Sequence, residues 1–214
     1  MGNKRFLALL SIIAGFICTT TAMGQDPDRR RFELFLGYSH NRVDVGPVED
    51  FDPGDDIEFD DIFDEREGFN GFNASVVGNF SRYLGAKFDY SYHQKSFGFG
   101  ADNTTVRLHN ILGGIQVKDN STEGTFKPFA HALIGGAHVR NRVTFTGGCV
   151  AIVPSPCPNF TDSETGLAGA VGGGIDIRAS NKIDIRVIQF DYNPTRVFDS
   201  TQHNFRIGVG IVFH

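Results

Sequence analysis

Apolar and polar residues alternate with a period of two along most of the chain, and helical periodicity is hard to find. The clearest example is residues 84–94, "LGAKFDYSYHQ", where Phe88, Tyr90 and Tyr92 alternate with polar residues. Successive side chains of a strand point to opposite faces, so this pattern describes a strand with one apolar and one polar face. Comparable segments recur from residue 31 to the end of the chain, and together they predict eight β-strands.

Three stretches alternate less regularly. In residues 104–117 and 129–139 both faces carry mixed residues, so that Asn110 and His131 fall on an otherwise apolar side. The phase of the alternation also slips between Ile188 and Asp191. Such a slip indicates either a β-bulge or the end of the embedded part of the strand.

The connections between the predicted strands differ in length in an ordered way. The two longest are an acidic segment of about residues 44–67 and a cysteine-containing segment of about residues 141–165, and both follow odd-numbered strands. Connections such as "SRYLG" and "ASN" are short. Outer-membrane barrels have this asymmetry, with short periplasmic turns and longer extracellular loops.

Alternation alone also fits a soluble barrel of the lipocalin type, in which the apolar residues face inward. The polar face here is rich in Gly, Ser, Asn and opposite charges, which suits a filled polar interior; the charges are Lys87, Asp89, Arg107, Asp176, Arg178, Asp184, Arg186 and Arg206. Aromatic residues gather near strand ends, as in interfacial girdles: Phe80, Tyr83, Tyr92, Phe97 and Phe213. We therefore predict an all-β fold, an eight-stranded antiparallel transmembrane β-barrel with up-and-down meander topology.

The first 24 residues have the layout of a secretory signal peptide. Lys4 and Arg5 precede an apolar run that ends at Cys18, and small residues follow up to Gly24. The run is shorter than the roughly 20 residues that a membrane-spanning helix needs. We therefore predict a signal peptide over 1–24 and one barrel domain over 25–214, located in the cell outer membrane.

The charge of the chain limits its partners. Without the signal peptide, 18 basic and 25 acidic residues give a formal charge of 18 − 25 = −7. An acidic chain without a basic stripe is a poor match for nucleic-acid phosphates. An eight-stranded barrel has an interior filled by side chains, which argues against general porin activity.

Several segments carry a family resemblance, among them "FELFLGYS", "KPFAHALIGG" and "NFRIGVGIVF". They resemble the small outer-membrane β-barrel domain family that groups with the OmpA transmembrane domain, OmpX and the neisserial opacity proteins. The resemblance extends over almost the whole chain after the signal peptide. It implies a fold and a location but no activity, and we expect a monomer.

The last strand carries the most specific motif. Arg206, Gly208, Ile211 and Phe213 match a polar-x-Gly-x-x-apolar-x-aromatic pattern that resembles the outer-membrane assembly signal. The resemblance implies that the barrel-insertion machinery pairs with this strand first. Only His214, one residue beyond the aromatic position, departs from the pattern.

The long acidic connection is a candidate interaction segment. Residues 48–67 hold eleven of the 25 acidic residues, interleaved with Phe and Ile. They fit a solvated loop, a weak Ca²⁺ or Mg²⁺ site, or a loop whose apolar residues dock on a protein partner. The candidate residues are Asp50, Asp52, Asp55, Asp56, Phe59, Asp60 and Asp61. We expect no other cofactor, and the spacing is not that of an EF-hand.

Two cysteines remain after the signal peptide, Cys149 and Cys157. An even pair in an exported chain predicts a disulfide. A metal or redox pair is the alternative, although no histidines are close enough in sequence to complete a zinc site.

These features favour a non-enzymatic outer-membrane barrel with a structural or adhesion-like role through its extracellular loops. Its expected partners are outer-membrane lipid or lipopolysaccharide, the insertion machinery, and an extracellular protein or host surface. One alternative is a lipid-modifying barrel enzyme, because Asp89, Ser91 and His93 share the polar face. The same residues also fit an interior hydrogen-bond ladder. A narrow channel is the second alternative.

Overall fold

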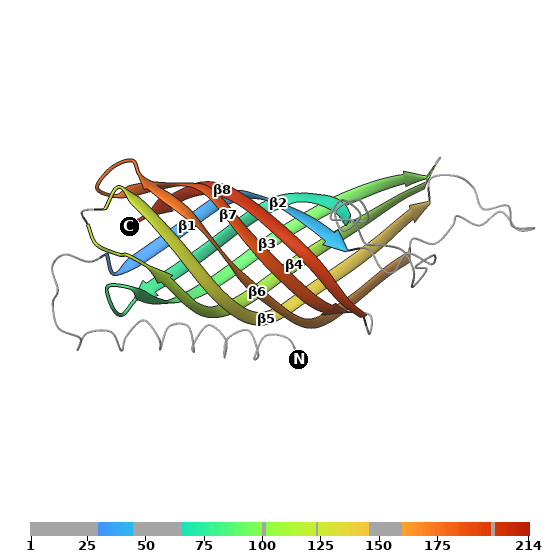
Figure 1. Ribbon diagram of the computed structural model, residues 1–214. Coiled ribbons are helices and arrows are strands. Elements are labelled where there is room, and N and C mark those ends of the chain that lie inside the picture. The colour runs from blue at the N-terminus through green and yellow to red at the C-terminus, as the bar shows by residue number, and fades with distance from the viewer. Residues whose placement is uncertain (1–29, 45–65, 100–101, 123, 146–159, 198–199) are drawn as a thin grey trace, which may run out of the picture.

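The computed structural model describes residues 30–44, 66–99, 102–122, 124–145, 160–197 and 200–214. They form eight strands: β1 (Phe32–Asp44), β2 (Arg66–Asn79), β3 (Leu84–Phe99), β4 (Asp102–Lys118), β5 (Phe126–Phe145), β6 (Phe160–Arg178), β7 (Ile183–Val197) and β8 (Ser200–Phe213). Each strand pairs antiparallel with the next, and β8 pairs with β1, so the sheet closes into a barrel (Figure 1). The predicted eight-stranded meander is confirmed.

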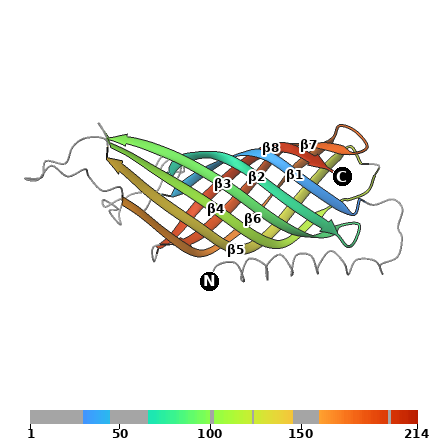
Figure 2. The same ribbon diagram turned by 180° about the vertical axis from the view of Figure 1, so that it is seen from behind.

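The two ends of the barrel differ. Three short turns and the C-terminus lie at one end, which we call the turn end (Figures 1 and 2). These turns are closed locally: the backbone amides of Phe80 and Ser81 donate to the carbonyl of Leu84, and the Ser81 hydroxyl accepts from the Leu84 amide at 2.9 Å. The other end, where β1, β3, β5 and β7 finish, is called the loop end.

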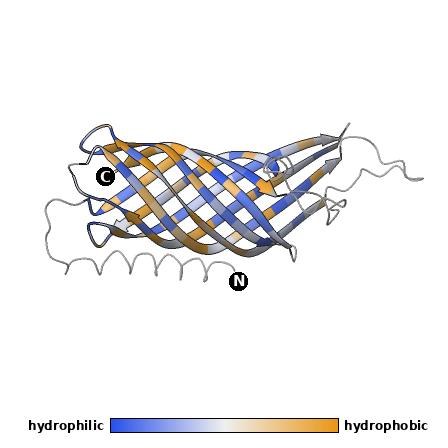
Figure 3. Ribbon diagram, viewed as in Figure 1, coloured by the Kyte–Doolittle hydropathy of each residue, from blue (hydrophilic) through white to orange (hydrophobic). Residues whose placement is uncertain are grey.

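The outer face of the barrel is apolar. Ile134 is 65% exposed, Leu167 61% and Phe32 53%. Figure 3 shows hydrophobic and hydrophilic residues alternating along the strands. Exposing so many large apolar side chains to water would be unfavourable, whereas hydrocarbon accommodates them. The soluble lipocalin-type alternative is therefore wrong. The closed barrel and its apolar exterior are those of an outer-membrane protein. Short turns face the periplasm in such barrels, so we expect the turn end to be periplasmic and the loop end extracellular.

No helix in the described residues is long and apolar enough to cross a membrane.

The strands range from 13 residues in β1 to 20 residues in β5. All are longer than the roughly 9–11 residues that a transmembrane strand needs. The phase slip expected near Ile188 is confirmed as an irregularity, because the register of β7 against β8 shifts between Arg186 and Gln189. Val187 and Ile188 are both exposed there, and Gln189 is buried. The bulge thus lets β7 keep its polar residues inside on both sides of the slip.

One side of the barrel rises higher at the loop end. The pairing of β2 with β3 ends at Asn70 and Gln94, and that of β6 with β7 ends at Leu167 and Arg196. Beyond these rungs β3 to β6 continue as a four-stranded sheet, which we call the tall wall; it comprises residues 95–99, 102–107, 139–145 and 160–166. Figure 1 shows β3, β4 and β5 reaching past β1 and β8 at this end.

Candidate functional site

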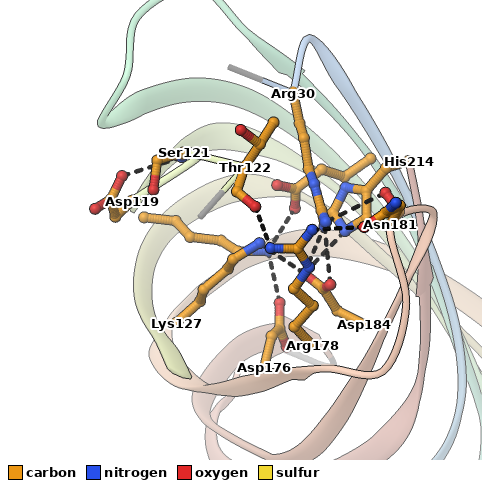
Figure 4. A network of polar contacts seen from close by, with 12 residues as sticks. Arg30, Asp119, Ser121, Thr122, Lys127, Asp176, Arg178, Asn181, Asp184 and His214 are labelled. Atoms are coloured by element: carbon orange, nitrogen blue, oxygen red, sulfur yellow. Dashed lines mark hydrogen bonds and ion pairs between the residues drawn. The ribbon is translucent and has the colours of Figure 1, made fainter. Parts of the chain in front are cut away.

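The interior at the turn end is an ionic network, and Asp184 of β7 is its outermost centre (Figure 4). Arg30 donates from Nη1 to both carboxylate oxygens of Asp184, at 2.8 and 2.9 Å. Lys127 Nζ donates to Oδ2 at 3.2 Å, and His214 Nε2 lies 2.9 Å from the same oxygen. The residues before the first strand and after the last one therefore meet on a single carboxylate.

A second group of charges lies next to the first and is centred on Asp176 of β6. Arg186 donates to both of its carboxylate oxygens, at 2.8 and 3.1 Å. Lys118 Nζ bridges Asp176 and Glu33, at 2.8 and 3.0 Å. The guanidinium carbon of Arg186 lies over two aromatic rings, 4.3 Å from the Phe35 centroid and 4.0 Å from Phe129. Such cation–π contacts become stronger when the cation is desolvated.

A third group, centred on Arg206 of β8, lies deepest in the turn half of the interior, next to the middle of the barrel. Arg206 donates to Asp191 at 2.7 and 2.9 Å and to Asp89 at 2.9 Å. His131 Nε2 lies 2.9 Å from Asp191, and Lys87 Nζ lies 3.7 Å from Asp89. These five side chains are almost fully buried. Paired charges of this kind are costly to separate, because removal of one partner leaves a bare charge out of water.

An uncharged polar layer follows toward the loop end. Ser39 Oγ lies 2.9 Å from Nε2 of His93, and the Asn110 amide donates to Ser91 at 3.4 Å and to Asn193 at 3.0 Å. Ser91 and His93 thus contact different partners rather than each other, and both are 0% exposed. The arrangement is that of an interior hydrogen-bond ladder.

A cluster of apolar side chains lies in the interior toward the loop end, which the sequence interpretation did not anticipate. Its members, here called the apolar segment, are Val43, Phe69, Leu108, Leu112, Leu133, Ala137, Val139, Ala168, Ala170 and Val197. Phe97, expected in a girdle, instead points inward and packs against this segment. The irregular alternation of residues 104–117 and 129–139 follows from it, because β4 and β5 have apolar residues on both faces here.

An aromatic and histidine girdle surrounds the outside of the barrel near the loop end. On β3 and β4, the Tyr90 hydroxyl lies 2.9 Å from Nδ1 of His109, and the Tyr92 and His109 rings are 4.8 Å apart. His109 pairs across the ladder with His138 of β5. On β7 and β8, Tyr192 lies 2.5 Å from Nδ1 of His203. Amphipathic rings at this position mark the boundary between hydrocarbon and headgroups.

Three arginines lie on the outer face just beyond this girdle. Arg107 of β4 stands directly opposite Arg140 of β5, and Arg142 is the next outward residue of β5. We call Arg107, Arg140 and Arg142 the basic row. Arg107 was expected inside the barrel, but the buried neighbour Leu108 sets the phase and turns Arg107 outward. Sequence reasoning missed the row because its members come from two strands whose register was not known.

The four residues of the assembly motif lie on β8, with Arg206 and Gly208 buried and Ile211 and Phe213 facing outward. A Cβ added at Gly208 would have no neighbour closer than 3.4 Å, whereas one at Gly210 would lie 2.4 Å from the carbonyl oxygen of Leu36. Close packing therefore requires glycine at position 210 and not at 208, and use of this motif by the insertion machinery stays a prediction.

Other predicted features lie outside the described residues. They are the signal peptide over 1–24, the acidic-loop residues Asp50, Asp52, Asp55, Asp56, Phe59, Asp60 and Asp61, and the cysteines Cys149 and Cys157. Among the described residues, no group of three or more His, Cys, Asp or Glu could hold a metal ion.

Fold and site together define a class, the small outer-membrane β-barrels with a filled interior. No protein-family model and no curated protein sequence matches the chain. Solved structures of the same fold do. Ail, the attachment invasion locus protein of Yersinia pestis, is 16% identical with a TM-score of 0.56, and the match covers 86% of this chain and 99% of Ail. Neisserial surface protein A is 11% identical with a TM-score of 0.54, covering 85% of this chain and 96% of that protein.

Proposed function

We propose that the protein is a non-enzymatic outer-membrane barrel that acts at the cell surface through the parts of its chain at the loop end. The observation that carries this proposal is a difference between two parts of the barrel: the interior is filled by side chains, whereas the strands and connections at the loop end extend beyond the girdle. The charged interior side chains Asp89, Asp191 and Arg206 are engaged with one another and have at most 1% exposure. The tall wall, in contrast, projects beyond the girdle at the end where the two longest connections lie.

The resemblance in fold supports this role without fixing a ligand. Ail is an attachment invasion locus protein, and one of its structures is a complex with the heparin analogue sucrose octasulfate, with a TM-score of 0.55 and 15% identity to this chain. For this chain, the acidic segment that follows β1 favours a protein partner with a basic surface.

Adherence of cells to a cultured epithelial layer tests the proposal. Cells that display the full chain are compared with cells displaying variants in which residues 45–65 or 146–159 are replaced by Gly-Ser linkers of equal length. We expect adherence to fall several-fold in at least one variant, while heat-modifiable gel mobility stays that of a folded barrel. Equal adherence by all three would contradict the proposal.

Two further measurements address the alternatives. For a lipid-modifying enzyme, lipid A mass spectra should differ between cells with and without the protein, and His93→Ala should abolish the difference. We expect no difference, because His93 is buried inside the barrel. For a channel, planar bilayers should show large stable conductance steps. We expect none, because ionic side chains fill the turn half of the interior and apolar side chains the loop half.

A further inference from the structure

We propose that the basic row binds phosphate groups of outer-leaflet glycolipids directly through its guanidinium groups, without bridging cations. This inference goes beyond the proposed surface role, because its partner is the lipid around the barrel and its site is the outer face of β4 and β5. Through this contact, Arg107, Arg140 and Arg142 anchor the barrel to the outer leaflet.

The register brings the three arginines together. Arg107 and Arg140 face each other directly on neighbouring strands, and Arg142 stands opposite Thr105 on the next outward rung. On the far side of β5, Ser163 and Thr161 of β6 are the partners of Arg140 and Arg142. Hydroxyl groups therefore border the guanidinium groups, and they can donate further hydrogen bonds to a phosphate oxygen.

The row has no compensating anion among the described residues. Arg107 Nε donates to the neutral amide oxygen of Gln94 at 3.1 Å, and Arg140 and Arg142 are exposed. No described side chain on the outer face of β3, β4, β5 or β6 is an Asp or Glu. Like charges placed directly opposite each other destabilise a sheet. An anion supplied from outside the protein would relieve this repulsion.

The interior shows that the fold elsewhere pairs its cations carefully. Lys118 lies within 3.0 Å of Glu33 and Asp176, and Arg206 within 2.9 Å of Asp89 and Asp191. The row on the outer face, which has no acidic partner among the described residues, therefore contrasts with the barrel interior. Guanidinium groups bind phosphate in a bidentate manner, and basic side chains at a membrane surface attract anionic headgroups.

The height of the row favours lipid phosphate over a ligand far from the membrane. His109 and His138 form a rung of the outer girdle, and Arg107 and Arg140 form the next rung outward. Successive outward-facing residues of a strand are two positions apart. With a rise of about 3.3 Å per residue and a strand tilt of about 40°, each outward-facing rung therefore adds about 5 Å of height along the barrel axis. Arg140 thus stands about 5 Å and Arg142 about 10 Å beyond the girdle, at the depth of headgroup phosphates.

Native mass spectrometry of the folded full-length protein in detergent tests the proposal, with bis-phosphorylated lipid A as the probe. We expect lipid A affinity to fall about tenfold or more in the triple variant R107Q/R140Q/R142Q. The matched control R31Q/R82Q/K182Q removes three charges at the turn end and should change the affinity by less than about twofold. Heat-modifiable mobility verifies folding of each variant; if the triple variant does not fold, R140Q and R142Q are measured singly.

Four results would overturn the proposal. The first is unchanged affinity in the folded arginine variants, and the second is equal binding of fully dephosphorylated lipid A, which would assign the affinity to acyl chains. The third is loss of binding in EDTA, because a cation bridge would then carry the contact. The fourth is equally tight, arginine-dependent binding of soluble inositol hexakisphosphate, which would identify the site as one for free polyanions.

Discussion

The barrel interior has two halves: a turn half, filled by the three ionic groups, and a loop half, which contains the apolar segment. Both halves are tightly buried, but by side chains of opposite chemistry. Arg206 and Asp191 in the turn half are as deeply buried as Leu112 and Ala137 in the loop half, all with at most 1% exposure. The turn half is held by directional ion pairs, whereas the loop half is held by contact between apolar groups. Directional pairs fail when one member is lost, while an apolar cluster relaxes around a gap. Burial alone therefore does not predict how the two halves respond to change.

The largest effect is expected for Arg206→Met. The variant leaves Asp89 and Asp191 buried without their arginine, and we expect a loss of about 3–5 kcal/mol in the free energy of unfolding. Urea titration in lipid vesicles, followed by heat-modifiable mobility, measures it. Addition of Asp89→Asn and Asp191→Asn to this variant should restore part of the lost stability. If Arg206→Met alone were as stable as the native barrel, the ion pairs of Arg206 would not contribute to stability.

In the loop half, Leu112→Ala should cost about 2–4 kcal/mol, because the side chain is lost from a packed apolar cluster that can partly collapse. The same urea titration applies. Ile134→Ala is the matched control, since Ile134 faces lipid and leaves no interior cavity. If the two variants lost equal stability, the apolar segment would not be acting as a packed core.

A smaller effect is expected for Phe35→Leu in the turn half. The variant removes one of the two rings that contact Arg186 and keeps its ion pair with Asp176. We expect a loss of about 1–2 kcal/mol by urea titration. Phe32→Leu, on the outer face of the same strand, is the control. A larger effect for Phe32→Leu than for Phe35→Leu would contradict a role of the ring in holding Arg186.

The smallest effect is expected at a water-exposed pair, Arg82 and Asp119, in two turns at the turn end. Arg82 Nε donates to Asp119 at 3.2 Å, and this hydrogen bond holds the pKa of Asp119 below its ordinary value. Exposed pairs contribute less than about 1 kcal/mol. A carboxyl whose pKa is lowered on folding contributes stability above its ordinary pKa of about 3.9, and the contribution disappears as the pH falls through the lower folded value. Asp119→Asn should therefore lower the urea midpoint slightly at pH 7, and the difference between the variant and the native barrel should shrink as the pH falls below the ordinary pKa of the carboxyl.

Much of the architecture could be predicted from the sequence, because the alternation of apolar and polar residues reports directly on a sheet with lipid on one face. Strand number, topology and the position of the bulge near Ile188 followed from this signal. The polar face of β3, with Lys87, Asp89, Ser91 and His93, was also identified as interior. These properties depend on residues close together in the chain.

The composition of the interior and the basic row depended on distant residues. In β4, Leu108 and Leu112 face inward while Ile111 faces lipid, so apolar residues on both faces erased the alternation. The sequence pattern therefore could not tell whether Arg107 faces inward or outward. The position of Arg107 opposite Arg140 also required the register of β4 against β5, which two irregular strands do not reveal. Both the composition of the interior and the basic row thus depend on which strands pair and in which register, and the sequence pattern did not give this information.

The ion pairs of the turn half also impose an order of events in time. Arg30 and Asp184 are 154 residues apart, and Arg206 and Asp89 are 117 apart. Contacts between such distant residues are slow to form, because the entropy of the intervening chain must be lost first. We expect these charges to remain hydrated while strands are added one by one, and to pair only when β8 meets β1. Closure would then be the committing step of folding, and reopening would require many buried charges to regain water together.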